Sequence, residues 1–283
     1  FHRSITDQIN NIFRVMNKEK FIDWLDGHLS ALELKNIDFC SVSAIRKKMD
    51  TMILQKYAKK VYSQNGEDGI TMKLVELLYD DPMNKNFVEF GVESGEECNT
   101  RILYENYGWN GLMMDGTYYN TFKNLQLEFV TKENILELFK KYKVPKNINL
   151  LGVDIDMNDW HVLNEIIKEH TADIIIVEYN AIIPPTEAKV VFYDPKQTWD
   201  GTDYYGASLL AYNRLLKPEG YTLVCTDPRG VNAFFVRTSL LEERNIEFEN
   251  MGDVSKLYTK PNYKNRRNGT HRKDDKNREY IKL

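Results

Sequence analysis

Short apolar runs alternate with longer stretches of helical periodicity over most of the chain. The runs are NFVEFG, GLMMDG, INLLGVDID, DIIIVEYN, YTLVCTD and NAFFVR, at residues 86–91, 111–116, 148–156, 173–180, 221–227 and 232–237. Each is short enough for a strand that is buried on both faces. Residues 97–107, 118–129, 133–142, 159–170 and 206–217 have the spacing of amphipathic helices. This alternation predicts a mostly parallel sheet with helices on both faces.

Only the short segment DPRGV, whose Asp227 also ends the run YTLVCTD, connects the last two runs. Because a parallel crossover needs a longer connection, these two runs should form an antiparallel hairpin that closes the sheet. The predicted fold class is therefore α/β, with a Rossmann-like sheet that is mostly parallel. We expect an N-terminal helical region at residues 1–60, the main domain at residues 61–250, and a polar, basic C-terminal tail at residues 251–283.

Composition and charge exclude several classes of protein. With 283 residues and 42% hydrophobic positions, the chain can bury one sizeable core. Residues 256–283 carry ten Lys and Arg against three Asp and Glu, so the rest of the chain has a charge of −11 within the total of −4. A body of that charge argues against nucleic-acid binding. The sequence contains no apolar stretch of membrane-spanning length and no signal-peptide block, so we expect a cytoplasmic protein without membrane insertion.

Acids and glycines follow the first two predicted strands, where open α/β sheets bind their ligands. Glu89, Gly91 and Gly95 belong to the first turn, and glycine there allows a tight turn and close approach to a ligand. Asp115 ends the second strand, where a carboxylate can accept hydrogen bonds from both ribose hydroxyls of an adenosine group. Since the chain has no phosphate-binding loop with Gly-Lys-Ser or Gly-Lys-Thr, these residues favour a nucleoside cofactor.

The charge of the first turn favours one nucleoside cofactor over another. Val92 occupies the position of the middle glycine in the dinucleotide-binding pattern, and Glu93, Glu96 and Glu97 make the turn acidic. Such a turn should repel a diphosphate and attract an ammonium and a sulfonium group. The cofactor expected from this pattern is S-adenosylmethionine.

The ordered set of motifs resembles the class I S-adenosylmethionine-dependent methyltransferases, and within them the FkbM-like enzymes. The resemblance is carried by YSQNGED at residues 62–68, NFVEFGVESG, GLMMDG, GVDIDMNDW, IIIVEYN and GVNAFFVR, and it covers roughly residues 60–240. It implies methyl transfer to an oxygen of a small, often sugar-like acceptor, as in polysaccharide biosynthesis. A homo-oligomer is compatible with this resemblance.

The resemblance also implies which residues would hold the cofactor. Glu89, Gly91 and Gly95 would hold the methionine end, Asp115 the ribose, Glu133 or Asn134 the adenine edge, and Ser63 and Gln64 the cofactor carboxylate. Val92 and Glu93 depart from the glycine or alanine that this family often has in the first loop.

Three acids close the strands predicted at residues 148–156 and 173–180. Strand alternation places Asp154 and Asp156 on one face, and Glu178 ends the neighbouring strand. Three readings are open: the acids hold Mg²⁺, or Asp154 or Asp156 acts as a general base, or the group only makes structural hydrogen bonds. Asn158 or Asp159 is expected to cap the next helix, and His161 is a candidate base or an ordinary helix residue.

A long insertion at residues 181–205 is expected to overhang the same edge of the sheet. Its aromatic and acidic residues suit a wall that faces a carbohydrate, although packing within a long loop would need the same residue types. They are Tyr193, Trp199, Asp203, Tyr204 and Tyr205. The function expected from these patterns is O-methylation of a sugar, a nucleotide-sugar or a related glycan precursor. The alternatives are N-methylation and a non-enzymatic protein that binds a ligand or partner.

Overall fold

The structure is a computed structural model in which residues 51–263 and 269–283 are described. The chain divides into two compact units, Phe1–Met52 and Ile53–Leu283, and all the elements named below belong to the second. The N-terminal helical region that the sequence predicts at residues 1–60 lies outside the described residues except for residues 51–60. This last part contains the short 3-10 helix η1 (Leu54–Tyr57).

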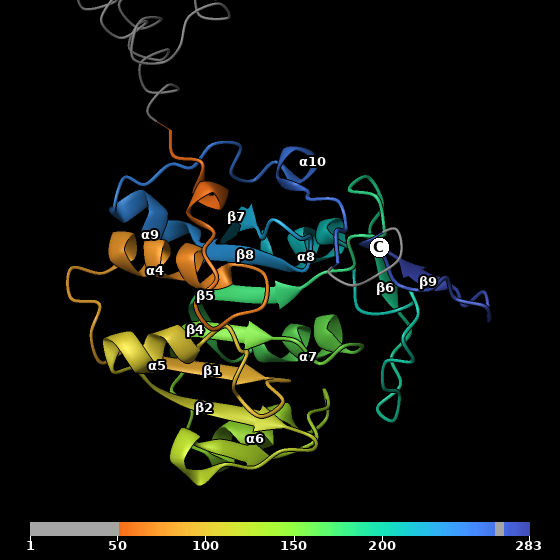
Figure 1. Cartoon of the computed structure of the whole chain (residues 1–283), viewed down its shortest axis with the longest axis horizontal. Coiled ribbons are helices and arrows are strands. Elements are labelled where there is room, and N and C mark those ends of the chain that lie inside the picture. The colour runs from red at the N-terminus through yellow and green to blue at the C-terminus, as the bar shows by residue number, and fades with distance from the viewer. Residues whose placement is uncertain (1–50, 264–268) are drawn as a thin grey trace, which may run out of the picture. The chain divides into compact units, whose positions relative to one another are not determined.

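A seven-stranded sheet forms the centre of this unit, with the strand order β3-β2-β1-β4-β5-β8-β7. Strands β1 to β5 run parallel, whereas β8 is antiparallel to both β5 and β7. The strands are β1 (Asn86–Phe90), β2 (Asn110–Asp115), β3 (Leu125–Leu127), β4 (Asn147–Val153), β5 (Thr171–Glu178), β7 (Tyr221–Thr226) and β8 (Asn232–Arg237). The predicted Rossmann-like sheet with its closing hairpin is confirmed (Figure 1).

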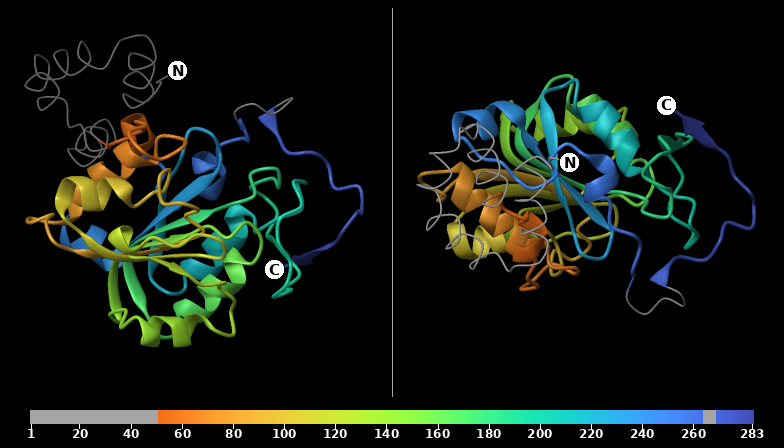
Figure 2. Two further views of the ribbon diagram at one scale, coloured as in Figure 1. Left: turned by 60° about the horizontal axis from the view of Figure 1, so that its bottom comes forward. Right: turned by 90° about the horizontal axis from the view of Figure 1, so that it is seen from above.

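Helices cover both faces of the sheet. Helices α4 and α5 lie on one face and α6, α7 and α8 on the other, as the turned view in Figure 2 shows. The helices are α4 (Glu67–Leu78), α5 (Arg101–Tyr107), α6 (Ile135–Lys141), α7 (Asp159–Ile166), α8 (Leu209–Leu216), α9 (Thr238–Glu243) and α10 (Val254–Leu257). None of the helices in the described part of the chain has the length and apolarity that a membrane crossing needs.

The apolar runs are buried because the central strands have neighbours on both sides and helices on both faces. From Ile174 to Val177 of β5, all four side chains are at most 1% exposed. This explains why the sequence shows continuous apolar runs there instead of alternation.

Residues 118–129 differ from the prediction of a helix. They form the 3-10 helix η2 (Thr121–Lys123), a left-handed residue at Asn124, and the edge strand β3. Asn120 accepts a hydrogen bond from the amide of Phe122 through its side chain, and such local bonds compete with a regular helix. The wrong assignment therefore has a local cause, since asparagine twice breaks the helical pattern within five residues.

A small antiparallel ribbon lies beyond the carboxyl ends of the main strands (Figure 1). It pairs β6 (Lys189–Val191), which belongs to the insertion, with β9 (Tyr280–Lys282), at the end of the C-terminal tail. Thr202 and Arg272 form a further isolated bridge between the same two segments. The insertion and the described part of the tail therefore form one substructure.

Candidate functional site

Three carboxylates meet at the carboxyl edge of the sheet. Asp154 and Asp156 follow β4, and Glu178 ends β5. Val153 of β4 is paired with Val177 of β5, so Asp154 and Glu178 each lie one residue beyond this pair. Each side chain has a carboxylate oxygen within 4.8 Å of such an oxygen on the other two. The structure thus brings together the three acids that the sequence placed at one edge.

A tight turn, and not strand alternation, brings Asp156 back to Asp154. Strand β4 ends at Val153, and Asp156 has a φ of +66°, in the left-handed region that non-glycine residues adopt rarely. The amide of Met157 donates to the carbonyl of Ile155 at 2.9 Å, which closes the turn. A left-handed aspartate costs stability, so its presence beside two other acids suggests a role for the conformation.

Asp154 and Glu178 are half-buried and Asp156 is exposed, and the closeness of the three acids disfavours full ionisation of the cluster. Burial, followed by the charges of neighbouring acids, raises the pKa values of Asp154 and Glu178 well above their usual range. The pKa of Asp156 is raised by loss of solvent and by Glu93 and Asp115. Oxygen Oε2 of Glu178 is buried and has no hydrogen-bond partner in the described part of the chain. A proton or a cation would relieve this repulsion, and three carboxylate oxygens suit Mg²⁺.

The two residues expected to cap helix α7 serve other purposes. Asn158 occupies the N-cap position, but its side chain makes no capping hydrogen bond; its Nδ2 donates instead to the carbonyl of Asp194 in the insertion, at 2.9 Å. The carboxylate of Asp159 accepts from the amide of Ile155 at 2.6 Å, and burial raises its pKa to about 7. Asp159 therefore holds the turn that carries Asp156.

Two acids of the YSQNGED motif hold the segment that precedes α4. Oxygen Oδ2 of Asp68 accepts from the amides of Val61, Tyr62 and Ser63 and from the Ser63 hydroxyl, all at 2.7–2.8 Å. Glu67 accepts from Asn65 and, across the fold, from Nδ2 of Asn232 at 2.9 Å. Ser63 is buried by these contacts, while Gln64 and Asn65 line a cavity described below.

Glu89 and Gly91 shape the first turn in different ways. Both carboxylate oxygens of Glu89 accept backbone amides, from Asn99 and Thr100 at 2.9 Å, and burial raises its pKa. Glu89 therefore holds the segment before α5 and lines neither of the cavities at this edge. Gly91 has a φ of +76°, and a Cβ atom there would lie 1.4 Å from the carbonyl oxygen of Asp154. Only glycine permits this contact between the turns after β1 and β4.

Asp115 lies at the end of β2, where the sequence placed a ribose-binding acid. Its Oδ2 accepts the amide of Glu93 at 2.8 Å, and its Oδ1 accepts the amides of Thr117 and Tyr118 at 2.7 and 3.1 Å. A carboxylate has about four acceptor positions, so about one remains for a ligand. This geometry leaves Asp115 able to bind one ribose hydroxyl, where the sequence analysis expected two.

The acidity of the first turn is partly neutralised. Glu96 forms ion pairs with Lys123 and Arg101, and Glu97 pairs with Lys60 at 3.1 Å. The carboxylates of these three ion pairs are exposed, so each pair is weak, but together they reduce the repulsion expected for a diphosphate. Glu93 has a φ of +48° and contributes the remaining negative charge of the turn, together with Asp115.

Two cavities open at this edge and share Asp156 as a lining residue. The smaller has a volume of ≈ 160 Å³ and lies between the turns after β1, β2 and β3. Its lining residues are Gly91, Met114, Asp115, Gly116, Thr117, Glu128, Phe129, Val130, Ile155, Asp156, Asn158, Gln197 and Thr198. Oxygen Oδ1 of Asn158, a residue only 6% exposed, has no hydrogen-bond partner in the parts that the structure describes.

The larger cavity has a volume of ≈ 420 Å³, which is within the usual range for small-molecule sites. Its lining residues come from the segment before α4, the turn after β1, the acid cluster, the insertion, the connection between β7 and β8, and the tail: Lys60, Gln64, Asn65, Glu97, Asp156, Glu178, Trp199, Val231, Tyr263 and His271. The volume of the smaller cavity, ≈ 160 Å³, lies below that range.

The residues expected at the adenine edge lie outside both cavities. Asn134 accepts the amide of Thr131 and donates to the carbonyl of Phe129, and it thereby shapes the turn before α6. Glu133 accepts a hydrogen bond from the hydroxyl of Tyr193. Phe129 and its two neighbours in sequence line the smaller cavity in their place.

The aromatic residues of the insertion divide into packing and cavity residues. Tyr204 and Tyr205 are each 3% exposed and pack together with residues of the ribbon. Asp203 accepts the amide of Asp274 of the tail. Trp199 lines the larger cavity, whereas Tyr193 lines neither cavity. Of the five predicted acceptor residues, the structure places Trp199 at the site.

His161 is held away from the acid cluster. Its Nε2 lies 2.9 Å from the carbonyl oxygen of Val191, and burial lowers its pKa. Its ring packs between those of Trp160 and Tyr193. These contacts describe a helix residue that anchors the insertion, and His161 lines neither cavity.

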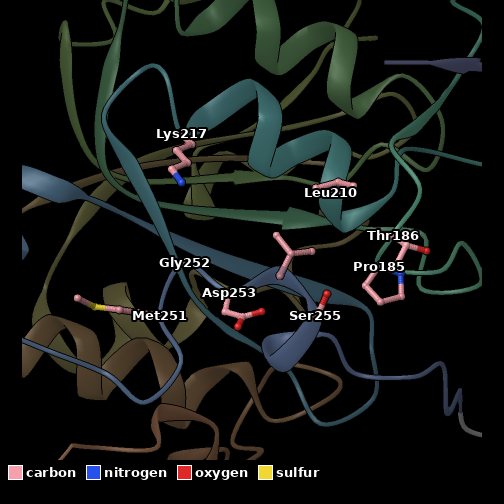
Figure 3. Close-up of a pocket in the computed structure, with 9 residues that line it drawn as sticks. Pro185, Thr186, Leu210, Lys217, Met251, Gly252, Asp253 and Ser255 are labelled. Carbon is pink, nitrogen blue, oxygen red and sulfur yellow. The ribbon is translucent and has the colours of Figure 1, made fainter. Parts of the chain in front are cut away.

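A third hollow of ≈ 710 Å³ lies beside α8 and α10 (Figure 3). Lys217 and Asp253 are its ionisable lining residues, and it shares no lining residue with the two cavities at the carboxyl edge. Its chemistry does not point to a reaction.

Models of known protein families and the curated proteins give no match to the chain. Among solved structures, the CurJ carbon methyltransferase is similar with 9% sequence identity and a TM-score of 0.33, over 62% of this chain and 55% of that one. The CMeT domain of the citrinin polyketide synthase is similar with 13% identity and a TM-score of 0.31, over 60% and 51%. The chain spans about half the length of these two proteins.

Proposed function

We propose that the protein is an S-adenosylmethionine-dependent O-methyltransferase, FkbM-like in its motifs, which acts on a hydroxyl of a sugar, a nucleotide-sugar or a related glycan precursor. The observation that supports this most is the position of Asp156, which borders both cavities and belongs to the acid cluster. A cofactor in one cavity and an acceptor in the other would meet beside a group that can take a proton.

The residues of the smaller cavity fit the cofactor by their chemistry. Asp115 retains about one acceptor position for a ribose hydroxyl, and Oδ1 of Asn158 is a buried acceptor without a partner among the described residues. Gln64 and Asn65, at the far side of Asp156, offer amide groups for the amino-acid end of the cofactor. The acids Glu93, Asp115 and Asp156 complement its ammonium and sulfonium groups.

Bound S-adenosylmethionine supplies a methyl group on a sulfonium centre. The chain's own part is to align the acceptor hydroxyl and to take its proton. Asp156 suits the second task because it lines both cavities and its raised pKa makes it a stronger base than an ordinary carboxylate. Asp154, the other candidate base, lines neither cavity. If Mg²⁺ is required, Asp154, Asp156 and Glu178 would hold it, and it would supply a Lewis acid at the hydroxyl.

Calorimetric titration of S-adenosylmethionine into the full chain tests the cofactor. We expect micromolar binding that weakens about tenfold or more in Asp115→Ala, because a hydrogen bond to a charged group contributes about 1.5–3 kcal/mol. Asp81→Ala is the matched control, since Asp81 is exposed and accepts one backbone amide far from both cavities. No binding to the wild-type protein would refute the proposal and favour a non-enzymatic ligand-binding protein.

A further inference from the structure

The C-terminal tail contributes residues to the larger cavity. Tyr263 and His271 line it together with Trp199 of the insertion. The ring centroid of His271 lies 4.7 Å from the ring centroid of Trp199 and 4.5 Å from that of Tyr263, so the three rings form a continuous group. Tyr205 supports this group from behind, since its hydroxyl lies 2.8 Å from that of Tyr263. We call Trp199, Tyr263 and His271 the aromatic wall.

Specific contacts fix the tail at this place. Arg278 donates to Asp200 at 2.8 Å and to Asp274 at 2.9 Å, and its guanidinium lies 4.2 Å from the ring centroid of Tyr204. The amide of Tyr263 donates to the carbonyl of Gly269 at 2.8 Å. The contacts of Arg278 with Asp200 and Tyr204, together with the β6–β9 ribbon, join the tail to the insertion.

Apart from Val231, the other residues that line the larger cavity are polar or charged. Asp156 and Glu178 offer carboxylates to an acceptor, while Gln64 and Asn65 are the residues proposed above for the amino-acid end of the cofactor. Among the described lining residues Lys60 is the one lysine, and it is already paired with Glu97 at 3.1 Å. A phosphate in this cavity would meet the carboxylates of Asp156 and Glu178, and the charge of Lys60 is already balanced by Glu97. An uncharged ring with hydroxyl groups would find aromatic side chains and hydrogen-bond acceptors among the lining residues.

We infer that the tail and the insertion together bind the ring of an uncharged cyclic polyol, such as a glycosyl residue. One face of the ring packs on the aromatic wall, whose electron-rich faces attract polarised C–H groups. The hydroxyls at the ring's edge then point to Asp156 and Glu178. This inference rests on the proposed function and narrows its acceptor from sugars in general to the uncharged ones, with the aromatic wall as the part that selects them.

Saturation-transfer NMR on the full chain with S-adenosylmethionine tests this, with methyl α-glucopyranoside, methyl α-mannopyranoside and methyl β-galactopyranoside as probes. We expect transfer to ring C–H protons of at least one glycoside. Trp199→Ala, Tyr263→Ala and His271→Ala should each weaken its binding about five- to tenfold. Tyr263→Phe keeps the ring and should retain the signal. Tyr119→Ala is the control, because Tyr119 is 61% exposed and lines neither cavity.

The outcomes distinguish a failure of the inference about the aromatic wall from a failure of the proposed function. If the protein binds S-adenosylmethionine but shows no transfer from any of the three glycosides, the inference about the aromatic wall is wrong while the proposed function stands. Equal signals in the wild-type protein and the three alanine variants would also overturn the inference. The inference would also be wrong if uridine diphosphate bound more tightly than every glycoside, with or without Mg²⁺, because the cavity would then select an anion. Failure to bind S-adenosylmethionine would refute the proposed function itself.

Discussion

Replacing Glu178 with glutamine should make the metal-free protein more stable. The carboxylate oxygens of Asp154, Asp156 and Glu178 lie within 4.8 Å of one another. Two full charges at that distance repel by about 3.5 kcal/mol at an effective dielectric constant of about 20. The acids avoid part of this cost by binding protons, so we expect Glu178→Gln to raise the free energy of unfolding by about 1–3 kcal/mol at pH 8.

The measurement is urea or thermal unfolding in the presence of a chelator. For a domain of this size, each kcal/mol corresponds to about 2–4 °C in Tm. Glu137→Gln is the matched control, because Glu137 is exposed on α6 and its replacement should change stability by less than about 0.5 kcal/mol. Addition of Mg²⁺ or Mn²⁺ should raise the Tm of the wild-type protein if the cluster binds a cation, and Glu178→Gln should lose this rise.

A loss of stability in Glu178→Gln would refute this reasoning. It would mean that the carboxylate makes hydrogen bonds in the native protein that outweigh the repulsion, and that the cluster is a structural scaffold. An equal rise of Tm with Mg²⁺ in the variant and the wild-type protein would remove Glu178 from any metal site.

Two further predictions concern the turn after β1 and the tail. Gly91→Ala should lower the free energy of unfolding by about 3 kcal/mol or more, because the new Cβ would overlap the carbonyl oxygen of Asp154. Gly201 has a φ of +81° but lies in open space, so Gly201→Ala should lower it by only about 1–2 kcal/mol. Equal losses for the two variants in urea unfolding would contradict this prediction. Hydrogen bonds lower the pKa of Asp200, chiefly from Thr202, and that of Asp274, chiefly from Arg278. The pKa values of both carboxyl groups are lower in the native protein than in the unfolded chain. The two carboxylates therefore stabilise the native tail fully above about pH 4, and this contribution is lost as the pH falls through their native pKa values. Amide hydrogen exchange in β9, corrected for its intrinsic rate, should then increase at a higher pH than exchange in β4 and β5.

The sheet could be predicted from the sequence because its signals are local. Six of the seven main strands coincide with apolar runs, and the short DPRGV connection identified the antiparallel hairpin. Strand β3 was missed because three residues, of which Leu127 is 55% exposed, give no apolar run. Strands β6 and β9 were missed for the same reason, and their pairing joins residues about ninety positions apart.

The acid cluster could be predicted for a related reason. The ends of neighbouring parallel strands meet at one edge, so Asp154 and Glu178 had to lie close together once β4 and β5 were recognised. The turn that brings Asp156 back was not predictable from alternation, since it depends on a left-handed φ and on the contact between Asp159 and Ile155.

The cavity walls could not be predicted, because distant segments build them. No pattern in the tail distinguishes Tyr263 or His271 from solvated residues, and their place depends on the pairing of the tail with the insertion. Asn158 looked like a helix cap, and its contact with Asp194 depends on how the insertion folds back. Glu133 and Asn134 were expected at the adenine edge from the resemblance, and the structure places them in other contacts.

The separation of the β6–β9 ribbon from the main sheet has a consequence for how such a protein can change. All seven main strands find their neighbours without the ribbon, so the sheet and the turns after β1 and β2 do not depend on it for their backbone pairing. Residues 269–283 of the tail can therefore vary at less risk to the sheet than residues of the insertion such as Ala188 and Val190, which belong to the main core. Under the proposed function, changes at Trp199, Tyr263 and His271 would alter the acceptor side of the site, while the donor side, among the described residues, would depend on the insertion only through Gln197 and Thr198.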